Sequence, residues 1–329
     1  MSDSAVSALC PLSCPYGLYA EQLSGTSFTT PRKDNQKVWL YRIRPTVGHS
    51  PFLACDVESG GAALASNLVV NDFSSCHISP NQYRWRPFSM EHLTGPAAAN
   101  RKVDFLQGLA TLAGQGSPDA KSGMAIHIYT ANASMDRKAF TNSDGDMLIV
   151  PQTGVLHIRT EMGMLRVAPG HIAVVQRGIA FSVAVTEVSR GYICEVYNGH
   201  FKLPELGPIG ANGLAAPRDF LHPTAEFEDV EGEYQYVQKF VGKFFSYKRT
   251  HSPFDVVAWH GNYVRKQCTC TRHNEKRQPP LVRDFSPHLL LCPRFFSLLL
   301  RSPTCTTCPS SARLAPFVST TSTPPSSRC

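Results

Sequence analysis

A regular alternation of short apolar segments and glycine-containing turns between residues 142 and 200 most constrains the fold of this chain. Turn signals recur about every eight to twelve residues, which is the spacing expected for the strands of a β-sandwich or barrel. No helix of ordinary length fits between them. The expected strands are 147–150, 155–158, 164–167, 172–175, 181–185 and 192–196.

Glycine follows another turn-forming or polar residue in most of the expected turns, where a reversing chain often needs a positive φ. These pairs are Asp144-Gly145, Thr153-Gly154, Met162-Gly163, Pro169-Gly170, Arg177-Gly178 and Arg190-Gly191. A meander of six short strands with one apolar face buries that face by curling into a double-sheet jelly roll or small barrel. The predicted fold class is therefore mainly β.

Three further elements are predicted upstream of this region. The segment 37–44 alternates apolar and polar residues and is expected to form an edge strand that ends at Pro45. Apolar residues at helical spacing in 103–113, followed by Gly114 at a C-cap position, favour a helix. Strict alternation in 124–131 predicts the first strand of the barrel.

The composition changes abruptly after Tyr263. Residues 264–329 contain ten Lys+Arg and two Asp+Glu, a net charge of +8, whereas residues 1–263 are close to neutral at −1. The tail also has no glycine, tyrosine or tryptophan. We therefore divide the chain into 1–122, with strands, loops and one helix packing on the barrel, 123–263, the barrel, and 264–329, a tail expected to be disordered.

The sequence favours a cytoplasmic protein without a membrane or nucleic-acid partner. The N-terminus has no basic residue and no apolar run of signal-peptide length, and no apolar segment reaches the roughly 20 residues of a membrane span. Arg84, Trp85 and Arg86 form too short a basic patch in a nearly neutral body to predict specific nucleic-acid binding. The body cysteines lack framework spacing, so reduced thiols are expected; they are Cys10, Cys14, Cys55, Cys76 and Cys194.

The strand region resembles a cupin-type barrel, and longer phrases are more specific. Residues 14–25 (CPYGLYAEQLSG), 80–88 (PNQYRWRPF), 102–114 (KVDFLQGLATLAG) and 252–263 (SPFDVVAWHGNY) resemble the N-terminal half of the homogentisate 1,2-dioxygenase family. So do NSDGDMLIVPQTG and RGYICEVYNGHFKLPELGPIGANGLAAPRDFL within the strand region. The resemblance runs in order from about residue 14 to 263 and implies a cupin-like (RmlC-like) fold with the second barrel of the family missing.

This resemblance implies ring cleavage of homogentisate by O2 to maleylacetoacetate, in tyrosine and phenylalanine catabolism. It also implies Fe(II), held by two histidines and a glutamate with open positions for substrate and oxygen, and a hexamer built from trimers. In the family the iron ligands and the acid/base histidine lie beyond the phrase that ends at Tyr263. We therefore assign no catalytic, cofactor-binding or metal residue and expect this chain to bind no iron and to be inactive. The alternative is a non-catalytic cupin-like subunit or misspliced product that associates with full-length subunits.

The histidines of the first barrel do not show the ligand pattern of metal-binding cupins. His127 has no histidine neighbour at ligand spacing, and Ile179, Ala180 and Phe181 stand where a ligand histidine would follow the second motif. His157, His171 and His200 each stand alone among apolar residues, as packed or hydrogen-bonded histidines do. The loop 207–213 (GPIGANG) lacks the glycine spacing of a pyrophosphate site.

Two hypotheses concern the tail. Val264-Arg265 is what GTA-AGR encodes, the pattern of a 5′ splice donor, so the tail would be translated intron and the chain a truncated isoform or gene-model product. Alternatively, a zinc site could use Cys268, Cys270, His273, Cys305 and Cys308, although the first pair is CxC and no finger scaffold lies between.

Overall fold

The structure is a computed structural model of the 329-residue chain. It describes residues 16–55, 68–74, 102–202 and 220–263, together with the backbone of 266–269 and 313–314. The described residues form strands, turns and loops and contain no helix. None of them, accordingly, belongs to a helix long and apolar enough to cross a membrane.

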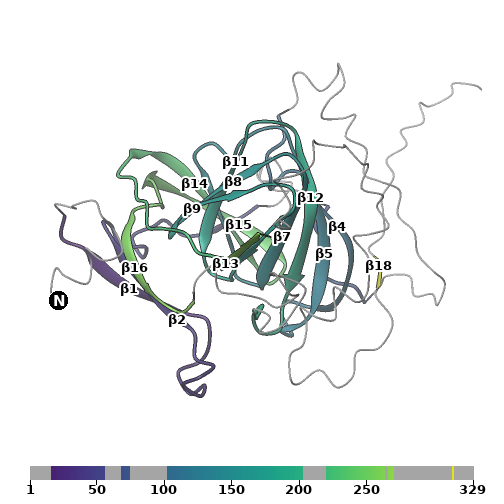
Figure 1. The fold of residues 1–329 in the computed structure, drawn as a ribbon, viewed down its shortest axis with the longest axis horizontal. Coiled ribbons are helices and arrows are strands. Elements are labelled where there is room, and N and C mark those ends of the chain that lie inside the picture. Colours follow the sequence, from purple (N-terminus) through teal and green to yellow (C-terminus); the bar gives the residue numbers. More distant parts are fainter. Residues whose placement is uncertain are drawn as a thin grey trace, which may run out of the picture.

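Eight consecutive strands form a jelly roll (Figure 1). They are β5 (Ser122–Ala131), β6 (Lys138–Asn142), β7 (Asp146–Thr153), β8 (Leu156–Thr160), β9 (Gly163–Val167), β10 (His171–Val175), β11 (Ala180–Val185) and β12 (Ser189–Val196). One sheet contains the order β10-β7-β12-β5 and the other β6-β11-β8-β9. This alternation of strands between two sheets is that of two Greek keys, the cupin arrangement. The predicted fold class and all six predicted strands between 142 and 200 are confirmed.

Alternation of side chains along each strand explains why the two sheets close on one core. In β8 the side chains of Leu156, Ile158 and Thr160 are buried, whereas His157 and Arg159 lie on the outer face. The inner faces of both sheets supply a single cluster that includes Tyr129, Phe140, Ile149, Phe181, Ile193 and Val237. Burial of this apolar surface is the main stabilising contribution to the barrel.

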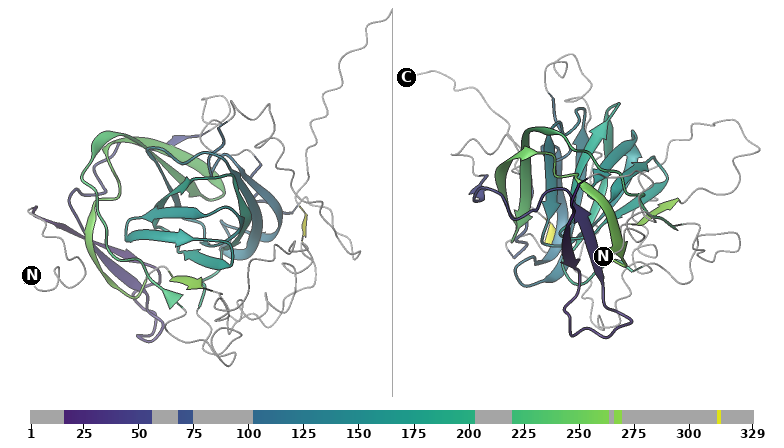
Figure 2. Two further views of the ribbon diagram at one scale, coloured as in Figure 1. Left: turned by 45° about the horizontal axis from the view of Figure 1, so that its top comes forward. Right: turned by 90° about the vertical axis from the view of Figure 1, so that its left-hand side faces the viewer.

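A long hairpin extends the second sheet. It consists of β14 (Glu231–Phe240) and β15 (Lys243–His251), and β14 pairs in parallel with β6. The short β3 (Leu53–Ala54) covers the far side of β15. Figure 2 shows the green hairpin curving along one side of the teal jelly roll. The hairpin matters for the site below, because β14 carries a lysine into the barrel.

The predicted helix at 103–113 is wrong. The Asp104 carboxylate accepts from the backbone N–H groups of Leu106 and Gln107, which closes a single turn, and β4 (Leu109–Ser117) then pairs with β5. At Gly108 a Cβ atom would lie 1.7 Å from the Thr130 carbonyl oxygen, so the chain there is pressed against the sheet. The apolar spacing that resembles a helical stripe instead supplies buried residues of a turn and a strand, and the sheet of the barrel begins at residue 109.

Two smaller predictions also need correction. The segment predicted as an edge strand is β2 (Lys37–Arg42), which lies between β1 (Tyr19–Ser24) and β16 (Val256–Gly261) in a three-stranded sheet. Arg190-Gly191 is not a turn, because both residues belong to β12 at an irregularity of its pairing with β7. There a Cβ on Gly191 would meet the Tyr129 ring at 2.6 Å, so this glycine permits close packing rather than a reversal.

A buried arginine joins the three-stranded sheet to the jelly roll. Arg42, 1% exposed, donates from Nη2 to Glu161 at 2.7 Å and from Nη1 to Asp255 at 3.2 Å. Glu161 belongs to the turn between β8 and β9, whereas Asp255 directly precedes β16. Burial alone would lower the pKa of Arg42, but the carboxylates of Glu161 and Asp255 outweigh it and raise the pKa. The guanidinium therefore remains charged and fixes the small sheet in place.

Two short strands of the tail add to the first sheet. The backbone of β17 (Lys266–Thr269) pairs antiparallel with β10 and with β13 (Phe220–Leu221), and β18 (Arg313–Leu314) pairs with β4. The change in composition after Tyr263 thus lies just before β17, which begins three residues later and pairs with the edge of β10.

Candidate functional site

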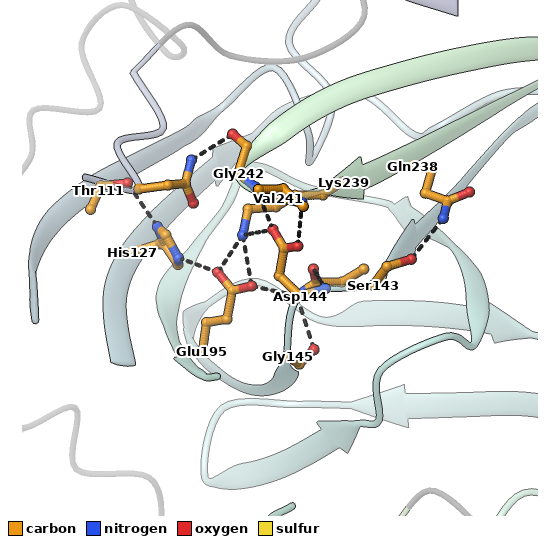
Figure 3. Close-up of polar contacts among 12 residues, drawn as sticks. Thr111, His127, Ser143, Asp144, Gly145, Glu195, Gln238, Lys239, Val241 and Gly242 are labelled. Carbon is orange, nitrogen blue, oxygen red and sulfur yellow. Dashed lines mark hydrogen bonds and ion pairs between the residues drawn. The ribbon is translucent and has the colours of Figure 1, made fainter. Parts of the chain in front are cut away.

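The interior of the jelly roll ends in a buried cluster of charged and polar side chains (Figure 3). His127 of β5 and Glu195 of β12 face inward, on the same strand faces as the core residues Tyr129 and Ile193. The two side chains meet with His127 Nε2 3.0 Å from Glu195 Oε2. His127 Nδ1 lies 2.9 Å from the Thr111 hydroxyl oxygen, so a neutral ring can donate to Glu195 and accept from Thr111.

Lys239 of β14 enters this cluster from the opposite sheet. Its ammonium donates to both carboxylate oxygens of Glu195, at 2.7 and 2.9 Å, and lies 3.0 Å from Asp144 Oδ2. Asn142 donates from Nδ2 to Glu195 Oε1 at 2.7 Å. Figure 3 shows the Lys239 ammonium lying between the two carboxylates. The cluster therefore joins both sheets of the barrel through one lysine.

Asp144 connects the cluster to the tip of the β14–β15 hairpin. Its two carboxylate oxygens accept from the backbone N–H groups of Val241 at 2.6 Å and Gly242 at 2.9 Å. Val241 has a φ of 49°, a left-handed conformation that is unfavourable for a β-branched residue. The aspartate thus satisfies the donors of a turn whose backbone is strained.

The charged neighbours of Glu195 determine its protonation state. Asp144, Glu195 and Lys239 are at most 2% exposed, so each charge depends on its partners. Burial by itself raises the pKa of Glu195, but the Lys239 ammonium and His127 outweigh it and lower the pKa to about 2. Glu195 is consequently ionised at neutral pH and is paired with a lysine that is 2% exposed.

The donor set of this cluster does not fit an iron ion. His127 Nε2 and both Glu195 oxygens are directed at each other and at the Lys239 ammonium, which supplies the positive charge between the carboxylates. The described residues include no group of three or more His, Cys, Asp or Glu side chains that could hold a metal. The arrangement is suited to cross-linking the two sheets electrostatically.

The four histidines considered from the sequence lie at separate places. His127 belongs to the buried cluster, and His157 lies on the outer face of β8. His171 begins β10 at the pairing with β17. His200 follows β12. The structure therefore does not bring the side chains of the four histidines together.

His200 holds a junction between the jelly roll and the three-stranded sheet. Its Nδ1 lies 3.0 Å from Asp146 Oδ1, and its Nε2 lies 2.7 Å from the Gly25 carbonyl oxygen. The Asp146 carboxylate also accepts hydrogen bonds from the backbone N–H groups of Arg177 and Phe201. Tyr263 packs edge-on against this ring, with the ring centroids 5.1 Å apart.

Several candidates from the sequence lie outside the described residues. These are the Arg84-Trp85-Arg86 patch, the loop 207–213 and all side chains of the candidate zinc ligands, of which only the Cys268 backbone is described, in β17.

The residues that form the buried cluster had a weak sequence signal. Glu195 and Lys239 each stand two positions from an inward-facing apolar residue, Ile193 and Val237 respectively, so alternation alone places their side chains inside the barrel. An isolated glutamate or lysine in a strand is more often exposed, which hides this signal. Their pairing could not be predicted because β12 and β14 belong to different sheets and are not hydrogen-bonded neighbours.

Comparison with known proteins gives a family match over most of the chain. Residues 5–267 match the family model for the N-terminal part of homogentisate 1,2-dioxygenase. The homogentisate 1,2-dioxygenase of Dictyostelium discoideum is 55% identical over 254 residues, covering 77% of this chain and 55% of that protein. The Caenorhabditis elegans protein of the same name is 54% identical over 254 residues, with the same coverage of both chains. The chain therefore spans about half the length of these relatives.

Similar solved structures include cupin proteins. A cupin superfamily protein from Desulfitobacterium hafniense is 11% identical, with a TM-score of 0.26, and the match covers 37% of this chain and 99% of that one. The strand order of the two sheets, rather than this weak similarity, defines the fold.

Proposed function

The chain belongs to the homogentisate 1,2-dioxygenase family, and from this we propose that it is the first-barrel half of an enzyme that opens the aromatic ring of homogentisate with O2. The observation that carries the proposal is the match of residues 5–267 to the N-terminal family model, with more than half of the aligned positions identical in the first two relatives. We propose maleylacetoacetate as the product, tyrosine and phenylalanine breakdown as the pathway and the cytoplasm as the location.

We propose further that the first barrel supports the reaction without holding Fe(II). The buried cluster supports this assignment, because the Lys239 ammonium already neutralises Glu195 and Asp144. A ferrous ion, when bound by the full-length enzyme, would supply adjacent positions for the substrate phenolate and dioxygen. We place its ligands in the part of the relatives that this chain does not span, and we derive no reaction step from the residues described.

A purified sample of this chain can test the proposal directly. Oxygen uptake is measured with homogentisate and Fe(II) under reducing conditions, and the full-length Dictyostelium relative serves as the positive control. We expect uptake by the relative and none above the iron-only background by this chain alone. Metal analysis after anaerobic loading and desalting should give less than one-tenth iron per chain. Turnover by the chain alone at a rate comparable with the relative would contradict the proposal.

A second candidate function is a non-catalytic subunit that associates with full-length copies. The composition change after Tyr263 and the well-packed described barrel favour this alternative, since such a chain could fold while lacking the second half. Sequencing of transcripts across the Tyr263 codon separates the cases. A transcript that continues into sequence encoding the rest of the relatives supports the enzyme, whereas a transcript population that always encodes the tail supports the separate subunit.

A further inference from the structure

We propose that the loop joining β1 and β2, residues 25–36, is a docking surface for the C-terminal half of a full-length family subunit. This inference rests on the proposed function, because it takes the missing half of the relatives as the partner. Figure 1 shows the purple loop extending beyond the sheets at the lower edge, and the right panel of Figure 2 shows the same projection. We hereafter call residues 25–36 the hairpin loop.

The hairpin loop presents an aromatic side chain to solvent. Phe28 is 94% exposed, the greatest value among the exposed large apolar side chains of the described residues. A single exposed apolar residue is common on protein surfaces and does not by itself indicate a partner. Three further features distinguish this one: a fixed loop conformation, the position of the loop base, and the basic charge of the loop.

The loop is held in one conformation by its own hydrogen bonds. Thr30 N–H donates to the Ser27 carbonyl at 3.1 Å, and Asp34 N–H donates to the Pro31 carbonyl at 2.9 Å. Gln36 N–H donates to Thr26 Oγ1 at 2.8 Å. A loop that is already ordered loses less conformational entropy on binding, which favours it as a contact surface.

The base of the loop is bonded to the last residues of the family-like barrel half. Asn262 accepts the Lys37 N–H at 2.9 Å and donates to the Asn35 carbonyl at 2.7 Å. Tyr263 packs so closely that a Cβ on Gly25 would lie 2.4 Å from its ring. The relatives continue beyond this point, since the matched family model is that of their N-terminal part and the aligned part covers only 55% of the Dictyostelium protein. The segment that enters their second half therefore starts beside the hairpin loop.

The charges of the loop indicate the chemistry of the docking surface. Arg32, Lys33 and Lys37 are exposed around the loop, against one exposed acidic residue, Asp34. Aromatic side chains and arginine are enriched at the centres of protein interfaces, with polar side chains around them. The complementary surface on the second half should be an apolar pocket for Phe28 bordered by carboxylates.

Binding of the separately produced second half of the Dictyostelium relative to this full chain tests the proposal. We expect Phe28→Ser to weaken the dissociation constant at least tenfold, and Val47→Ser to leave it within twofold of wild type. Val47 is a matched control, because it is 83% exposed and follows the opposite end of β2. Neither exposed position should affect folding, which circular dichroism verifies. Equal effects of the two substitutions, or no binding by the wild-type chain, would overturn the proposal.

Hydrogen exchange gives an independent measurement. The partner should slow exchange of the hairpin-loop amides more than fivefold, and Arg32→Glu combined with Lys33→Glu should remove this protection. Protection that appears instead as the concentration of the chain alone is raised would assign the loop to a second copy and refute the proposed occupant. Oxygen uptake by the mixture separates the two proposals. Binding that depends on the loop, without oxygen uptake, would support the docking surface and contradict the proposed enzymatic function. Oxygen uptake that is insensitive to Phe28→Ser would support the enzymatic function and contradict the docking surface.

Discussion

Lys239 and Glu195 form a buried ion pair across the interior of the jelly roll, with the ammonium 2.7 and 2.9 Å from the two carboxylate oxygens. The two residues come from opposite sheets, so the pair fixes the separation of the sheets at one end of the barrel. Buried ion pairs seldom add much net stability, because desolvation offsets the attraction. Removal of only one partner is costly, however, because the other charge is left buried and unpaired. Single substitutions in the cluster therefore test its role.

Replacing Lys239 by methionine should strongly destabilise the barrel. The substitution keeps much of the side-chain volume but leaves Glu195 and Asp144 buried without a counter-charge. We expect a loss of about 3 to 5 kcal/mol in the free energy of unfolding, measured by urea denaturation. Lys248→Met is the matched control, since Lys248 pairs with Glu233 while both side chains are about two-thirds exposed.

The control variant should change the unfolding free energy by less than about 1 kcal/mol, the usual magnitude for an exposed pair. A second variant that combines Lys239→Met with Glu195→Gln should lose less than the sum of the single losses, because the two residues interact directly. Losses that simply add would show that the pair is not energetically coupled.

The stability of the barrel should fall in acid through Glu195. Its pKa drops from 4.5 to about 2 in the folded state, where Lys239 and His127 outweigh the opposing effect of burial. A group whose pKa is depressed by folding contributes fully above its unfolded value, and this contribution is lost as pH falls from 4.5 toward 2. The contribution that disappears is on the order of 3 kcal/mol.

Glu195→Gln isolates this effect from the other carboxylates. The variant should be less stable than wild type at pH 7, and the difference in unfolding free energy between the two proteins should shrink between about pH 5 and pH 3. Urea unfolding at each pH supplies the measurement. A difference that stays constant over this range would mean that Glu195 does not titrate as its surroundings indicate.

Arg42 should be essential for attachment of the three-stranded sheet. Arg42→Met leaves Glu161 and Asp255 buried without their shared cation, and we expect a loss of about 3 to 5 kcal/mol. Hydrogen exchange should accelerate first in β1 and β2, while β7 and β12 keep their protection. Arg44→Met is the control, because Arg44 is 29% exposed and its pairs with Asp229 and Glu231 should contribute below about 1 kcal/mol. Uniform acceleration across both regions would place the role of Arg42 elsewhere.

The local β pattern was predictable from the sequence, whereas the long-range partners were not. The glycine turns at Thr153-Gly154 and Pro169-Gly170 have positive φ values of 75° and 91°, so the sequence identified real reversals. Phe105 and Leu109 also satisfied a helical spacing, and the pairing with β5 overrode it. Pairing between strands far apart in the chain is set by tertiary packing, which periodicity does not encode.

The same limit applies to the candidate site. Asp144 was expected only as part of a turn with Gly145. Its carboxylate also accepts hydrogen bonds from the tip of the β14–β15 hairpin, almost 100 residues later in the chain. Glu195 and Lys239 carry the correct inward phase in their strands, yet nothing local indicates that they face each other. The resemblance to a family therefore supplied the proposed function, and the structure added the pairing of Lys239 with the interior carboxylates of Glu195 and Asp144.

Val241 offers a substitution that should stabilise the protein. Its φ of 49° places a β-branched side chain in the left-handed region, and its side chain is 42% exposed, so little apolar burial is at stake. Asparagine tolerates this conformation and avoids the extra unfolded-state entropy of glycine. We expect Val241→Asn to raise the unfolding free energy by about 1 kcal/mol. Gly242→Ala is the opposite control, because φ is 74° there and a Cβ would lie 2.7 Å from the Asn71 Cβ, so stability should fall. A loss of stability in Val241→Asn would mean that the exposed valine makes contacts worth more than its backbone strain.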